Sequence, residues 1–178
     1  MKNLVARIAV VGTATAAAMF AGVAGANASV DGAGNDPVAN VAPAGTSQVL
    51  AKMSHSAAKA ALAASNIGIS SSGGCSDRQN PTCTSLEQVN ETSIQGAKTL
   101  KSASGCSMTV TGGTEVGHAS GTYSHYNGYK LDFSMNSCLT SYVTNNFTSI
   151  GGSKWQSAAG NIYYNESNHW DVTFHSAG

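Results

Sequence analysis

Two polar clusters hold the side chains that can do chemistry in this sparsely charged chain. Asp, Glu, Lys and Arg make up only 10% of its 178 residues. The stretch SHYNGYKLD nevertheless places His125 and Asp132 around Gly128, whose backbone freedom allows the two side chains to converge. The second cluster, ESNHWD, begins at Glu166 and can supply a third ligand and a base. A catalytic zinc site needs three protein ligands and one open position for water. The same spacing also arises by chance, and His125 and Asp132 can equally serve to hydrogen-bond a loop.

The first residues predict a secretory signal peptide. The chain opens with the basic residues Lys2 and Arg7 and continues with apolar and small residues. It then reaches Ala26-Asn27-Ala28, an A-x-A cleavage site. The apolar part is short and interrupted by Gly12, which disfavours a retained membrane anchor. We therefore expect residues 1–28 to be removed and the mature protein to be secreted, with no membrane association.

The remaining chain is long enough for one domain. We expect residues 29–70 to form a flexible leader, with a possible helix from Ser47 to Ser65 in which His55 lies at the surface. Residues 71–178 then form the folded domain. The formal net charge of zero gives no electrostatic reason to bind nucleic acid or an anionic membrane, and we expect a monomer.

Four cysteines in a secreted chain predict two disulfides. Three pairings are possible, and we favour Cys75–Cys83 with Cys106–Cys138 because the first pair encloses a short polar loop. A four-cysteine zinc site would show C-x₂₋₄-C spacing, which is absent from the sequence.

Hydrophobic spacing predicts an α+β fold with a mostly antiparallel sheet flanked by helices. One helix is expected over residues 85–102, starting at a capping box of Thr84 and Glu87. A second is expected over residues 139–150, closed by two glycines. Alternation of apolar and polar residues places Asp132 away from the core side of the strand over residues 129–133. It also puts His169 and Asp171 on the same face of the strand over residues 169–174. The expected strands cover residues 107–111, 129–133, 161–164 and 169–174.

The polar clusters resemble the motifs of a known family. Ser124-His125-x-x-Gly128-x-x-x-Asp132 resembles the S-H-x-x-G-x-A-x-D motif of zinc D-Ala-D-Ala carboxypeptidases and dipeptidases, the relatives of lysostaphin-type peptidases and of the Hedgehog domain. VTGGTEVGHASGTYSHYNGYKLDF, residues 110–133, is similar to the Hedgehog version, and YYNESNHWDVTF, residues 163–174, resembles the second family motif. The resemblance covers roughly the last two-thirds of the mature chain. It implies a Hedgehog/D-Ala-D-Ala peptidase-like fold that binds Zn²⁺.

The resemblance also implies roles for single residues. His125 and Asp132 become zinc ligands, and the third ligand depends on how the second motif is aligned. In the carboxypeptidase alignment His169 is the ligand and Glu166 is the general base. In the Hedgehog and lysostaphin alignment Asp171 is the ligand and His169 is the catalytic histidine. We favour His169 as the ligand, with Asp171 orienting an imidazole.

The sequence departs from the family in two places. Lys130 replaces the usual small residue, which costs little if its amine reaches solvent. The arginine of an S-G-Y-R stretch is missing, and TGGTE, residues 111–115, stands there instead. His118 can replace that arginine as a catalytic polar contact to the substrate or to the tetrahedral intermediate, or it is a plain loop histidine.

Together these features predict a secreted zinc peptidase that hydrolyses peptidoglycan stem peptides or cross-links, as a D,D-carboxypeptidase or endopeptidase. The metal would activate water, and Glu166 would carry its proton to the leaving amine. One alternative is a catalytically silent, Hedgehog-like binding module that retains zinc. Another is a disulfide-stabilised structural protein without metal, which leaves the paired motifs unexplained.

Overall fold

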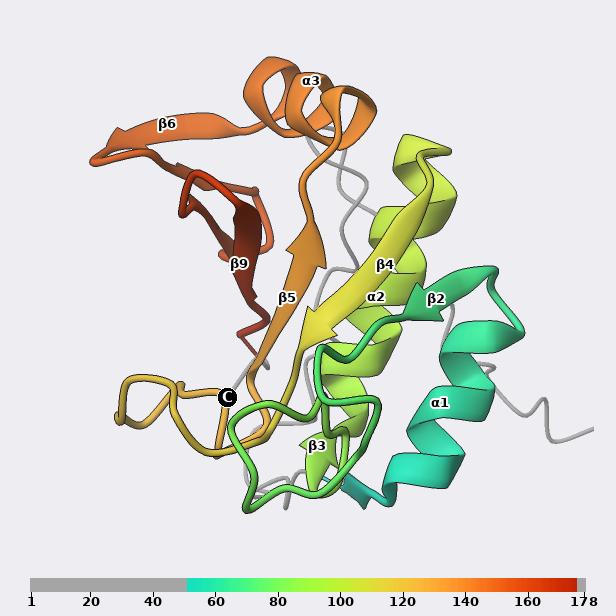
Figure 1. The fold of residues 1–178 in the computed structure, drawn as a ribbon. Coiled ribbons are helices and arrows are strands. Elements are labelled where there is room, and N and C mark those ends of the chain that lie inside the picture. The colour runs from blue at the N-terminus through green and yellow to red at the C-terminus, as the bar shows by residue number, and fades with distance from the viewer. Residues whose placement is uncertain (1–50, 176–178) are drawn as a thin grey trace, which may run out of the picture.

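The computed structural model describes residues 51–175, which form three helices and nine strands (Figure 1). None of these helices is long and apolar enough to cross a membrane. The elements in chain order are β1 (Lys52–Met53), α1 (His55–Ala63), β2 (Ile67–Ile69), β3 (Val89–Asn90), α2 (Glu91–Ser104), β4 (Met108–Gly112), β5 (Lys130–Ser134), α3 (Ser137–Asn146), β6 (Thr148–Gly151), β7 (Lys154–Gln156), β8 (Ile162–Asn165) and β9 (His169–Thr173).

Seven of the strands form one sheet in the order β2-β4-β5-β9-β8-β7-β6. The β2–β4 pair is parallel, and the other neighbours are antiparallel. Strands β1 and β3 form a separate antiparallel pair. The prediction of an α+β fold with a mostly antiparallel sheet is confirmed.

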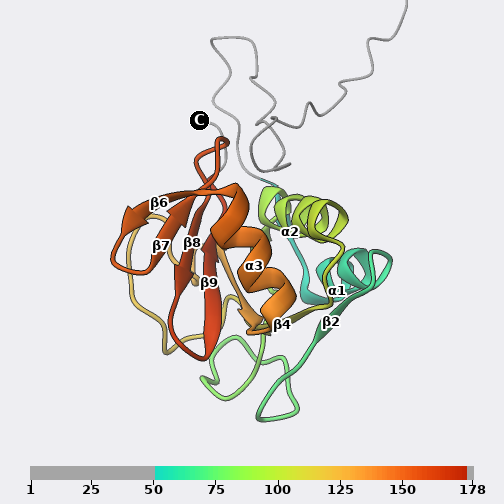
Figure 2. The ribbon, with the colours of Figure 1, turned by 90° about the horizontal axis from the view of Figure 1, so that it is seen from above.

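The helices cover one face of the sheet, and Figure 2 shows α2 and α3 on the same side of it. Alternate residues of β5 and β9 point into this interface, where they are fully buried. The opposite face of the same two strands carries Asp132 and Asp171. The buried core comprises residues from all three helices and the central strands, among them Ala58, Leu62, Ile94, Leu100, Val110, Leu131, Phe133, Leu139, Val143, Trp170 and Val172.

The expected capping box is wrong, because α2 begins at Glu91 and not near residue 85. The hydroxyl of Thr84 donates instead to the backbone oxygens of Ser70 and Thr111. The carboxylate of Glu87 accepts the backbone N–H of His55. Both capping side chains are therefore used by partners distant in sequence, and α2 starts later.

The second expected helix is present as α3, but the prediction extends it too far at its C-terminal end. Helix α3 ends at Asn146, and Phe147 adopts an extended backbone conformation. Its ring lies against Tyr163, with 4.5 Å between the ring centroids. Residues 148–150, expected to be helical, instead belong to β6, which pairs with β7. Tertiary packing of one aromatic ring thus ends the helix.

The folded unit begins earlier than residue 71. Ala58 and Leu62 of α1 are fully buried, and β2 pairs with β4, so both elements belong to the core. The expected leader boundary fell inside the fold because alanine gives a weak amphipathic signal, although its small size suits close helix packing. The signal peptide and residues 29–50 lie outside the described residues.

The predicted disulfides Cys75–Cys83 and Cys106–Cys138 are both present. The first closes the loop between β2 and β3. The second joins the region before β4 to α3. Both fit a protein that folds in an oxidising compartment.

We expect the second disulfide to contribute more to stability than the first. Its sequence separation is 32, against 8 for Cys75–Cys83. Loop-closure entropy then gives about 3–4 kcal/mol for the longer loop and about 2–3 kcal/mol for the shorter. Urea unfolding of the variants C106A/C138A and C75A/C83A measures this difference. An equal loss in both variants would contradict an entropic origin.

Candidate metal centre

The candidate site lies on the polar face of β5 and β9. Asp132 and Asp171 are opposite each other in this antiparallel pair. Both are buried, and they point away from the core side as the alternation predicted. The loop between β4 and β5, which hangs below the sheet in Figure 1, brings His118 and His125 to the same place. The two clusters separated in sequence therefore meet.

Three imidazoles converge on the carboxylate of Asp132. Oδ1 lies 3.2 Å from Nε2 of His125 and 3.5 Å from Nε2 of His169. Oδ2 lies 3.9 Å from Nδ1 of His118. Strand β4 leaves room for this carboxylate because it has Gly112 at this position. A Cβ at residue 112 would collide with the carboxylate of Asp132.

The hydrogen bonds of His118 and His125 orient both rings toward Asp132. Nδ1 of His125 lies 2.7 Å from the carbonyl oxygen of Gly113, which can only accept, so Nδ1 carries a proton and Nε2 faces Asp132. Nε2 of His118 lies 3.2 Å from Glu115, leaving Nδ1 toward Asp132. The two rings stack with centroids 3.9 Å apart. Partners of this kind on the far nitrogen are typical of metal-ligating histidines.

Glu115 was missed as a site residue by the sequence analysis. It is buried, and its carboxylate accepts the backbone N–H groups of Ser85 and Gly113. Burial alone would raise its pKa, but the hydrogen bonds from His118 and from these N–H groups outweigh burial and lower the pKa of Glu115. The sequence feature that could have indicated Glu115 is its carboxylate shortly after two glycines in TGGTE. The sequence analysis considered this stretch only because the family arginine is missing from it.

His118, His125 and Asp132 can together hold a metal ion, since their ligand atoms all lie within 4.8 Å of one another. Oδ1 of Asp132 is buried and has no hydrogen-bond partner despite its closeness to two imidazoles. An unpartnered buried carboxylate oxygen between ring nitrogens fits a cation between them. Two imidazoles and one carboxylate are the donors of both zinc sites and non-haem iron sites.

The second motif lies beside this group. Nδ1 of His169 lies 2.7 Å from the side-chain oxygen of Asn168, so it donates there. Its Nε2 faces Asp132 and also lies 3.4 Å from Oε2 of Glu166. Glu166 is 38% exposed and stands at the rim. The structure thus places His169 between the buried carboxylate and a solvent-accessible one.

Asp171 is held by Lys130. Nζ of Lys130 lies 2.6 Å from Oδ2 of Asp171, whereas Nε2 of His125 lies 3.8 Å from the same oxygen. The side chain of Lys130 is 26% exposed, yet its ammonium pairs with Asp171, because residues 130 and 132 share the site face of β5. Burial would raise the pKa of Asp171, but His125 and Lys130 outweigh it and lower that pKa.

Metal binding should release protons, because the neighbouring carboxylates raise the pKa of His125. Burial alone would lower its pKa, but the carboxylates of Asp132 and Asp171 outweigh burial and raise the pKa of His125 to about 9. Below that pH a metal must displace the proton from Nε2. We expect release of about one proton at pH 7.5 and an apparent affinity that rises about tenfold per pH unit up to pH 9. Calorimetry in buffers of different ionisation enthalpy measures the release; a pH-independent affinity would contradict it.

Comparison with known proteins adds no assignment: no protein-family model, no curated protein and no solved structure matches this chain.

Proposed function

We propose that the protein is a secreted zinc peptidase that hydrolyses peptidoglycan stem peptides or cross-links. The observation that carries the proposal is the convergence of three imidazoles on one buried carboxylate, with Glu166 at the rim. This arrangement unites the two sequence clusters that resemble the motifs of zinc carboxypeptidases. The resemblance supplies the substrate class.

The residues that would hold zinc are His118, His125 and Asp132. The sequence alone favoured His169 as third ligand, with Asp171 as the alternative, and gave His118 a contact with substrate. The ammonium of Lys130 lies against Asp171 and already neutralises it, which disfavours Asp171 as a ligand. His169 then remains free to act with Glu166.

Zinc held by these residues would activate water for attack and polarise the scissile carbonyl. The chain's own groups do the rest. Glu166 stands at the open side, where its carboxylate can accept a proton from water and pass it to the leaving amine. His169, 3.4 Å from Glu166, positions that carboxylate. Glu115 and the carbonyl of Gly113 fix the two ligand rings.

The test is digestion of purified peptidoglycan fragments by the mature protein, followed by mass spectrometry. One sample contains zinc and the matched sample contains a chelator. Chelator-sensitive release of D-alanine supports a carboxypeptidase, and cleaved cross-links support an endopeptidase. Equal product in both samples would refute a metal-dependent reaction.

A second candidate is a binding module that keeps its metal for stability. The missing family arginine favours it, because TGGTE, residues 111–115, offers no guanidinium to anchor a substrate. A folded sample that holds one zinc per chain, retains peptidoglycan fragments and yields no product would support this function over the peptidase.

A further inference from the structure

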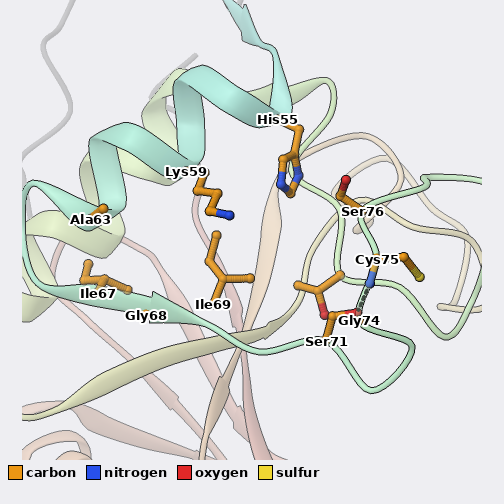
Figure 3. Close-up of a pocket in the computed structure, with 11 residues that line it drawn as sticks. His55, Lys59, Ala63, Ile67, Gly68, Ile69, Ser71, Gly74, Cys75 and Ser76 are labelled. Atoms are coloured by element: carbon orange, nitrogen blue, oxygen red, sulfur yellow. Dashed lines mark hydrogen bonds between the residues drawn. The ribbon is translucent and has the colours of Figure 1, made fainter.

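A cavity of about 500 Å³ lies between α1, β2 and the loop closed by Cys75–Cys83 (Figure 3). None of the residues of the candidate metal centre lines it. Its volume is in the range of ligand-binding cavities. The lining residues are His55, Lys59, Ala63, Ile67, Gly68, Ile69, Ser71, Gly74, Cys75, Ser76 and Thr84.

The cavity runs along the open edge of the large sheet. Strand β2 is the terminal strand and pairs only with β4. Three successive residues of β2, Ile67 to Ile69, line the cavity, although successive side chains point to opposite faces. The backbone itself therefore forms part of the wall, and Gly68 at its centre has no side chain to cover it.

The backbone groups of Ile67 and Ile69 face this open edge. The N–H of Ser70 donates to Val110 of β4, so the polar groups of Ser70 point toward that strand. Because N–H and C=O groups alternate between the two edges of a strand, those of Ile69 and Ile67 point away from β4. An extended peptide can pair with such an edge.

The lining is cationic. Lys59 contributes an ammonium, and no Asp or Glu is among the lining residues. Nδ1 of His55 accepts the backbone N–H of Leu86, which leaves its Nε2 as the donor. Burial and Lys59 lower the pKa of His55, against the effect of Glu87. Figure 3 shows His55 and Lys59 extending from α1 toward β2.

Glu87, whose charge acts on His55, does not line the cavity. The carboxylate of Glu87 is bonded to the backbone N–H of His55 at the start of α1. The side of the cavity opposite β2 thus presents an ammonium and an imidazole N–H to any ligand. A carboxylate matches both.

We propose that this cavity binds an extended peptide that adds a strand to β2 and places a carboxylate side chain against Lys59 and His55. The site is separate from the metal centre and needs no metal. Main-chain pairing supplies affinity, and the two nitrogen donors select an acidic residue.

The test uses acetyl-Thr-Val-Glu-Val-Thr-amide added to the mature chain in the presence of a chelator. Backbone amide NMR should show saturable shifts at Ile67 and Ile69. Exchange of the peptide's Glu for Gln should weaken binding about tenfold. Absence of saturable binding, or shifts confined to another surface, would overturn the proposal.

Two further comparisons separate strand addition from plain charge attraction. Lys59→Glu should weaken binding about tenfold, whereas Lys154→Glu, an exposed lysine on β7 at the other end of the sheet, should leave it unchanged. N-methylation of the Glu residue blocks one edge of the peptide strand, and N-methylation of the two Val residues blocks the other edge. Only the peptide whose methyl groups face β2 should lose binding. Equal loss in both lysine variants, or equal binding of both methylated peptides, would overturn the proposal.

Discussion

Asp132→Asn should remove stoichiometric metal binding and leave the protein folded. The carboxylate of Asp132 lies within 4 Å of three imidazoles, and its Oδ1 is buried without a hydrogen-bond partner. An amide keeps the shape but loses the charge that holds a divalent cation. The measurement is metal content after dialysis, with circular dichroism as the test of folding.

Matched variants identify the third ligand. His118→Ala should lose metal as Asp132→Asn does, because Nδ1 of His118 faces Asp132. Asp171→Asn should retain metal, since Lys130 already pairs with that carboxylate. His169→Gln should also retain it. Loss of metal in Asp171→Asn or His169→Gln with retention in His118→Ala would restore a ligand set based on the second motif.

The central strands and the disulfides were predictable because their signals are local. Alternation in YKLDF and HWDVTF correctly identified β5 and β9 and the face of each that carries polar residues. The pairing Cys75–Cys83 followed from a short intervening loop. These features depend on residues close together in sequence, where period and loop length are informative.

The edges of the fold were not predictable because their stabilising contacts are distant in sequence. Strand β6 has only exposed residues and so lacks an alternating signal. Strand β2 exists through its pairing with β4, about 40 residues later. Thr84 and Glu87 look like a capping box, yet their hydrogen bonds go to other segments. Tertiary partners overrode local propensity in each case.

The sequence predicted that the two polar clusters lie together, but not which of their side chains contact one another. His125, Asp132 and His169 were expected together, and the structure places both imidazoles beside the carboxylate of Asp132. Glu115 and Lys130 were not given their roles, because each acts by fixing another side chain through a contact that spacing does not reveal. Such supporting residues are visible only once the fold brings the loops together.

Glu166→Gln should lower peptide hydrolysis by about 10²–10⁴-fold while metal content stays unchanged. The carboxylate lies at the rim, 3.4 Å from His169, and does not belong to the group that can hold a metal. Glutamine keeps its size but cannot accept the proton from water. The rate is measured as the release of D-alanine or of cleaved cross-links from peptidoglycan fragments.

The control for Glu166→Gln is Glu91→Gln, an exposed carboxylate in the first turn of α2. This variant removes the same charge from the protein without touching the site, so its rate should equal that of the unchanged protein. Glu166→Ala should match Glu166→Gln, since both lack a base. Full activity in both Glu166 variants would exclude this residue as the base and leave His169, which faces the same space, as the group that takes the proton.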